Sequence, residues 1–311
     1  MNNRRPESSS LRSFFQEQLE QLRQLVDSHH KQKLKQQEEK ANLHNAIETL
    51  VEGTDTRIRG IGSYQKQLRD SASKLLNHIN TLVDNMPPPI LVNKTTLVTD
   101  PLVKAFFESP DIMQDLFSRN ANIQAFFNAP ENKDATEVFA LMYVTRKEKN
   151  ILGTELRNDL LLKEVKQTHV SFYDRRLVAP TATEADARMA MKRNLFECVV
   201  THLKKHITEL RHGLSEKEKL SVALHPEQNL NNPEVYIKML AERLSLPTEL
   251  IKLHDQVIRL NKMGVKLPLD ETESSDLLQL QALEVGDLCC QVISMVRYPR
   301  NELIQPKWVI I

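Results

Sequence analysis

The sequence predicts a mainly α protein, in which an N-terminal antiparallel helical hairpin or coiled coil precedes an α-rich body with a small β element. Apolar residues recur at helical spacing over residues 11–86, three consecutive prolines end that pattern, and helix-start signals recur through much of the remaining chain. We therefore expect a flexible N-terminus at 1–10, a helical arm at 11–86, a proline-rich spacer at 87–99 and a body at 100–311.

The first half of the arm has apolar residues on one helical face: Phe15, Leu19, Leu22, Val26, Leu43, Ile47 and Leu50. The stretch 29–40 interrupts them and is almost entirely polar, and a helix that is polar on all sides either bridges solvent or packs against a partner. In the second half, Leu68, Leu75 and Leu82 are seven residues apart, which is the repeat of a coiled-coil seam. The pattern predicts a protein partner or self-association through residues 11–86.

Composition argues against several classes of protein. The 311 residues include 42 Lys and Arg against 41 Asp and Glu, so no strong overall charge attracts the chain to nucleic acid or anionic lipid. Only seven glycines are present, and none forms the glycine-rich loops with which enzymes hold phosphates or expose a nucleophile. No apolar run is long enough to span a bilayer. We expect a non-enzymatic protein that needs no cofactor.

Cysteine usage indicates a reducing compartment. The chain has three cysteines: Cys198, Cys289 and Cys290. An odd number of cysteines, two of them adjacent, does not suit a framework of disulfides. The N-terminal residues contain no apolar run that resembles a secretion signal. These observations predict a cytoplasmic protein, although the Arg- and Ser-rich start leaves an organellar presequence open.

Residues 105–130 contain two similar stretches, AFFESP and AFFNAP. Two copies are too few for a solenoid, so we expect short helices within a helical string over 101–146, for which Asp134 with Glu137 is a further start signal. We expect one Phe of each pair to enter the core and the other to lie at the edge of the core. In the alternative interpretation, the Phe residues at this edge are partly exposed and form a docking patch. The candidate partner-binding residues are Phe106, Phe107, Phe126 and Phe127, together with Leu68, Leu75 and Leu82.

Two segments predict the small β element. Apolar and polar residues alternate in part of 160–179, and the segment 288–298 is short, apolar and followed by Pro299. Pairing these two segments would close a small sheet. Between them, residues 183–214 predict one long helix with an apolar face.

That long helix contains the metal-like spacing Cys198, His202 and His206, with Glu209 beyond. The ladder lies on the flank of the apolar face and lacks a general-base glutamate between its histidines, which favours solvated histidines, and we predict no metal site. Other acid–base residues are close in sequence, but no pocket motif gives them roles: Glu155, Asp159, His169 and Asp174. We therefore predict no catalytic residue.

Residues 236–264 predict two helices, with a break at Pro247 and an end at Gly264. The stretch LAERLSLP resembles the first half of a bacterial helix-turn-helix, although Ser245 replaces the usual turn glycine. The resemblance implies DNA contacts from the second helix through Lys252, Arg259 and Lys262. A plain helical hairpin is the alternative interpretation.

Two functions follow from these patterns. The first is a non-enzymatic protein-interaction or scaffold subunit of an intracellular assembly, which forms oligomers or binds a partner through the arm. The alternative is a DNA-binding regulator that uses the segment at 236–264. The last residues, PKWVII, are apolar and either dock as a final strand or are offered to a partner.

Overall fold

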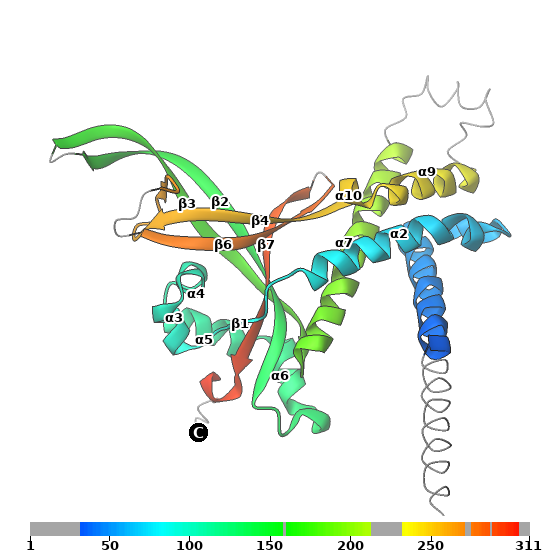
Figure 1. Cartoon of the computed structure of the whole chain (residues 1–311), viewed down its shortest axis with the longest axis horizontal. Coiled ribbons are helices and arrows are strands. Elements are labelled where there is room, and N and C mark those ends of the chain that lie inside the picture. Colours follow the sequence, from blue (N-terminus) through cyan, green and yellow to red (C-terminus); the bar gives the residue numbers. More distant parts are fainter. Residues whose placement is uncertain (1–31, 158–159, 213–231, 271–274, 287, 305–311) are drawn as a thin grey trace, which may run out of the picture.

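The computed structural model describes residues 32–157, 160–212, 232–270, 275–286 and 288–304. Its centre is a seven-stranded sheet with helices on both faces (Figure 1). The prediction of a mainly α fold with a small β element is therefore wrong, because most of the strands that build the sheet were assigned to helices or not assigned at all.

The sheet has the order β3-β2-β7-β6-β4-β5, in which neighbouring strands are antiparallel, and β1 pairs with β7 in parallel. The strands are β1 (Ile90–Leu91), β2 (Glu137–Arg157), β3 (Leu160–Thr181), β4 (Ile251–Asn261), β5 (Lys266–Leu267), β6 (Ser275–Val285) and β7 (Leu288–Pro299). Both segments predicted as strands, 160–179 and 288–298, are strands. They do not pair with each other, since β2 lies between them.

Strand β2 is buried on both faces. Leu141 and Tyr143 enter one apolar core, and Ala140, Met142 and Val144 enter the other. A strand covered on both sides has a continuous apolar run instead of an alternating pattern. The predicted helical string therefore ends earlier than expected, at a 3₁₀ turn, η2 (Pro130–Asn132), and the expected helix start at 134–137 is the start of a strand.

Three helices cover the first face and share a core with it: α2 (Tyr64–Asp84), α7 (Glu184–His212) and α9 (Pro233–Ser245). Helix α7 matches the predicted long helix over its described length, and Thr183 caps its start by accepting from the N–H of Asp186 at 3.1 Å. Helix α2 packs against α9 and α7. Its seam of Leu68 and Leu75 is buried in this shared core, so the predicted antiparallel coiled coil is wrong.

Four short helices cover the second face: α3 (Lys94–Thr99), α4 (Pro101–Phe106), α5 (Pro110–Ser118) and α6 (Ala121–Asn128). Each begins at an Asn, Asp or Ser whose side chain accepts from backbone N–H groups of the first turn. The predicted short helices over this part of the chain are confirmed.

The sheet curls until its two edges meet. His169 of β3 bridges to Val265 beside β5, and the N–H of Val170 donates to the carbonyl of Gly264 at 2.8 Å. Gly264 has φ +75°, a conformation that favours glycine, and a Cβ there would lie 3.1 Å from the Val170 carbonyl oxygen. Lys266 reinforces the junction through an ion pair with Glu148 of β2 at 3.2 Å.

The segment that resembles a helix-turn-helix contains one helix of that motif and not two. Helix α9 is followed by a single turn, α10 (Pro247–Leu250), and then by strand β4. Residues 251–261, expected in the second helix, pair with β6 along their whole length. The predicted helix pair is therefore wrong. Elsewhere in the described residues, 3₁₀ turns occur at η1 (Thr56–Gly60) and η4 (Arg300–Glu302).

Candidate functional site

The N-terminal helix leaves the body of the protein. Its described part covers residues 32–54, and Figure 1 shows it running away from α2 and not alongside it. All residues from 32 to 42 are exposed, including Leu34 with 46% of its surface accessible, and of the residues at 43–45 only Leu43 is half-buried. We call residues 32–45 the projecting helix.

The base of this helix is anchored in the first core. Ala46, Ile47, Leu50 and Val51 are buried among the side chains of α2, α7 and α9. Gly53 lies so close to α7 that a Cβ at this position would be 2.3 Å from Cγ1 of Val200. Glycine is therefore required here by close packing, and the helix continues through it to residue 54.

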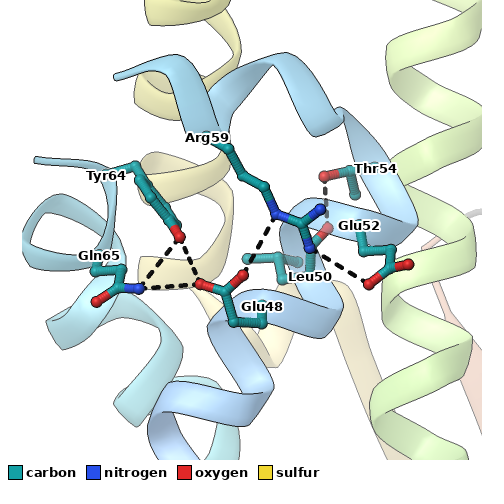
Figure 2. A network of polar contacts seen from close by, with 7 residues as sticks. All are labelled: Glu48, Leu50, Glu52, Thr54, Arg59, Tyr64 and Gln65. Carbon is teal, nitrogen blue, oxygen red and sulfur yellow. Dashed lines mark hydrogen bonds and ion pairs between the residues drawn. The ribbon is translucent and has the colours of Figure 1, made fainter. Parts of the chain in front are cut away.

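A cluster of polar contacts then joins the base of the helix to the following turn and to α2 (Figure 2). The carboxylate of Glu48 accepts from the hydroxyl of Tyr64 at 2.5 Å and from Nε2 of Gln65 at 3.0 Å, and it pairs with Nε of Arg59 at 3.4 Å. We call these four residues the Glu48 clamp. Because they come from three consecutive segments, the clamp fixes the direction in which the helix projects.

Electrostatics keep the clamp in its ionised form. The hydrogen bond from Tyr64 lowers the pKa of Glu48, and desolvation opposes it, while Gln65 and Arg59 lower the pKa further. Arg59 also pairs with Glu52 at 3.3 Å. At neutral pH, Glu48 is therefore an anion held by one cation and two neutral donors.

The turn after the helix has a second attachment. Asp55 is buried, accepts from the N–H of Arg57 at 3.1 Å and pairs with its Nη2 at 2.9 Å. The Arg57 guanidinium lies over the ring of Tyr236 on α9, 5.6 Å from the ring centre. The hydrogen bond with Asp55 raises the pKa of Arg57, so this ion pair is maintained at neutral pH. The projecting helix is thus connected to α2 and to α9.

The aromatic residues proposed for partner binding lie in the second core. Phe106, Phe107, Phe126 and Phe127 have between 1% and 9% of their surface accessible. Phe106 makes an edge-to-face contact with Phe172 of β3, with ring centres 5.3 Å apart. Both members of each pair are core residues, so they do not form an exposed docking patch in this fold.

The leucines proposed for partner binding belong to the body as well. Leu68 and Leu75 are fully buried, and Leu82 is half-buried against the same core. They hold α2 in place, and within the described part of the predicted arm the exposed stretch is the projecting helix. The sequence signal for this surface was the polar stretch at 29–40.

The residues proposed for DNA contact are on β4 and the turn after it. Lys252 and Lys262 are exposed, whereas Arg259 donates to the carbonyl of Leu269 and to Oγ of Ser275, both at 3.1 Å. They do not share a helix face, because residues 251–261 form strand β4 and not a helix.

The histidine ladder on α7 lines a polar cavity of about 340 Å³ between α7, α9, α10 and the β6–β7 turn. The ring of His202 packs against Gly286, where a Cβ would lie 2.0 Å from it, and Glu209 pairs with Lys205 at 3.7 Å. Burial raises the pKa of the Cys198 thiol, which disfavours the thiolate that binds metals. Within the described ranges, no three His, Cys, Asp or Glu side chains are grouped so that they could hold a metal ion.

Of the four acid–base residues that are close in sequence, the structure describes the side chains of two, and these two make separate contacts. His169 is at the junction of β3 with Val265, and Asp174 lies 3.5 Å from Oγ1 of Thr145. The side chains of Glu155 and Asp159 lie outside the described part of the chain.

The chain matches no protein-family model, and neither a curated protein nor a solved structure shows significant similarity to it. Among the described helices, none has the length and apolar character needed to cross a bilayer. The geometry above is therefore the basis for proposing a function.

Proposed function

We propose that the protein is a non-enzymatic interaction subunit of a larger assembly, and that it contacts a protein partner or a second copy through the N-terminal region at 11–86. One observation carries this proposal: every residue of the projecting helix except the half-buried Leu43 is exposed, and polar contacts of Glu48 tie the base of the helix to Arg59 and Tyr64.

Energetics support a role in association. A helix shorter than about 12–15 residues is only marginally stable in water, and burial against other elements supplies most helix stability in proteins. The projecting helix gains little from burial on its own body, since Leu43 is its only half-buried residue. A partner that covers the helix would supply this missing stabilisation.

The charges of the projecting helix favour a helical partner of mixed charge. Three lysines and two glutamates lie within eight residues, and all five are exposed: Lys33, Lys35, Glu38, Glu39 and Lys40. Such a surface suits the polar flanks of a helix–helix contact and is a poor match for the uniformly negative surface of a nucleic acid.

The Glu48 clamp contributes by preorganisation. Association costs less when the contacting element is already fixed, because less conformational freedom is lost on binding. The three contacts of Glu48 fix the helix direction before a partner is met.

The test compares two substitutions at the exposed Gln37, in the middle of the projecting helix. Gln37→Pro breaks the helix at a cost of about 3 kcal/mol, whereas Gln37→Ala preserves it. We expect Gln37→Pro to abolish association, measured by size exclusion with light scattering and by cross-linking in lysate, while Gln37→Ala retains it. The denaturation midpoint of the body should be the same in both. If Gln37→Pro associates as the natural chain does, the projecting helix is not the contact element.

A further inference from the structure

Strand β4 has one edge that is only partly paired. Strand β6 pairs with it from Ile251 to Asn261, but on the other side β5 reaches only Arg259 and Leu260. The N–H of Asn261 donates towards β5, to the Val265 carbonyl, at 3.0 Å. In an antiparallel strand, alternate residues direct their backbone groups to the same side, so the odd-numbered residues of β4 direct theirs away from β6.

The two ends of this outer edge are covered. The carbonyl of Ile251 accepts from Nε2 of His78 on α2 at 2.9 Å, and β5 covers Arg259. Between them, the outward backbone groups of Leu253, Asp255 and Val257 have no strand partner in the part of the chain that the structure describes. We call residues 253–257 the open edge.

A cleft of about 580 Å³ lies beside the open edge. Side chains of β4 and β6 line it, including Val257 and Leu277, each with 43% of its surface accessible, and Pro87, Pro88 and Pro101 line its other side. Its charged lining residues are Asp100 and Asp255, and no Lys or Arg lines it. The cleft therefore suits an extended segment that is apolar and carries a positive charge.

The chain itself contains such a segment. Residues 305–311, QPKWVII, lie outside the described part of the chain and combine Lys307 with four consecutive residues of high strand propensity, from Trp308 to Ile311. The seven residues are long enough to pair along the whole of the five-residue open edge. Strand addition of this kind uses backbone hydrogen bonds for affinity and side-chain pockets for specificity.

The position of the preceding residues favours docking between two copies. The N–H of Ile304 donates to Oγ of Ser118 at 2.9 Å, at the end of α5. Figure 1 shows α3, α4 and α5 between η4 and strand β4. A segment that starts at Ile304 would have to pass around these helices to reach the open edge of its own chain, whereas the segment of a second copy is not restricted in this way.

We propose that residues 305–311 of a second copy pair with the open edge as an added β-strand and place their apolar side chains in the cleft beside it. This contact is separate from the projecting helix and goes beyond the function proposed above.

The test measures tryptophan fluorescence, which reports on residues 305–311 alone because Trp308 is the only tryptophan of the chain. Burial of its ring should shift its fluorescence emission to shorter wavelength as the protein concentration of the full chain rises. Val257→Pro removes one outward N–H without affecting the pairing with β6, since the N–H of residue 257 faces away from β6. We expect this variant to need about tenfold more protein for the same shift, and the matched Val257→Ala to behave like the natural chain.

Mixing distinguishes docking between copies from docking within one. Val257→Pro protein, which keeps Trp308, is combined with an excess of Trp308→Phe protein, which keeps the open edge. The emission of Trp308 should shift on mixing, because the free segment finds an intact edge on the other copy. No shift on mixing, a shift independent of concentration, or a Val257→Pro variant that behaves like Val257→Ala would overturn the proposal.

Two controls complete the experiment. Equal melting temperatures of Val257→Pro and Val257→Ala establish that both are folded. Gln37→Pro should leave the concentration dependence of the Trp308 signal unchanged, so that failure of this contact and failure of the projecting helix are observed separately.

Discussion

Helix α2 and the projecting helix belong to the same predicted arm, yet their surroundings differ completely. In α2, Leu68 and Leu75 are buried against α7 and α9, whereas in the projecting helix Leu34 is exposed and Leu43 is half-buried. The comparison teaches that a repeat of leucines identifies a buried face but not the element that covers it. A helix without such a face has no place in the core and is free to meet another molecule.

The largest expected effect is a difference in the free energy of unfolding between a leucine substitution in α2 and one in the projecting helix. Leu75→Ala removes a fully buried side chain of α2 and should lower the free energy of unfolding by about 2–5 kcal/mol. Leu34→Ala in the projecting helix should change it by less than about 0.5 kcal/mol. Urea denaturation of both variants checks the difference, and equal losses would show that the projecting helix packs on the body.

A second prediction concerns the anchor of the projecting helix. Gly53→Ala places a methyl group against Val200 and should destabilise the protein by about 1–3 kcal/mol, because the core must shift to accommodate it. Gly60→Ala is the matched control, since a Cβ at that position meets nothing within 4 Å. Thermal melting of the two variants measures the difference, and a stable Gly53→Ala would disprove the close approach to α7.

The Glu48 clamp should give a smaller effect. Tyr64→Phe removes the hydroxyl that donates to Glu48 and should cost about 1 kcal/mol, a low value for a hydrogen bond to a charged group because the pair is partly exposed. A double-mutant cycle with Glu48→Gln measures the coupling. If the two losses simply add, the hydrogen bond does not contribute to stability.

The smallest effect is a pH dependence of the same clamp. The pKa of Glu48 is lowered in the folded protein from its ordinary value of 4.5, so its contribution is fully present above that value and is lost as the pH falls through the lowered pKa. The stability difference between the natural chain and Glu48→Gln should be constant near neutral pH and should shrink below about pH 4.5. Denaturant titrations at several pH values test this, and a difference that grows on acidification would contradict it.

Local signals predicted the helices well. The capping residue Asn232 with Pro233 marks the start of α9, and the side chain of Asn232 accepts from the N–H of Glu234 at 3.0 Å. The apolar face between 183 and 214 identified α7. These features depend on residues within a few positions of each other, which is the information that one sequence contains most clearly.

The sheet depends on distant residues and was mostly missed. Leu253, Val257 and Leu260 of β4 are spaced by four and three, which imitates a helical face, and only the pairing with β6 makes the segment a strand. The Glu48 clamp was missed for the same reason, since Glu48 meets Tyr64 only after the turn through η1. The polar stretch at 29–40 gave the one useful signal for the candidate site.

Strand β7 has a consequence for the order of folding. It joins β2, which is paired with β3, to β6, which is paired with β4. Val138 therefore meets Tyr298 across more than half of the chain, and such distant contacts form slowly. During synthesis, the edge of β2 that pairs with β7 stays unpaired in the β2–β3 hairpin until β7 emerges from the ribosome. A nascent chain arrested before β7 is complete should therefore be the form most exposed to chaperones and most prone to aggregate.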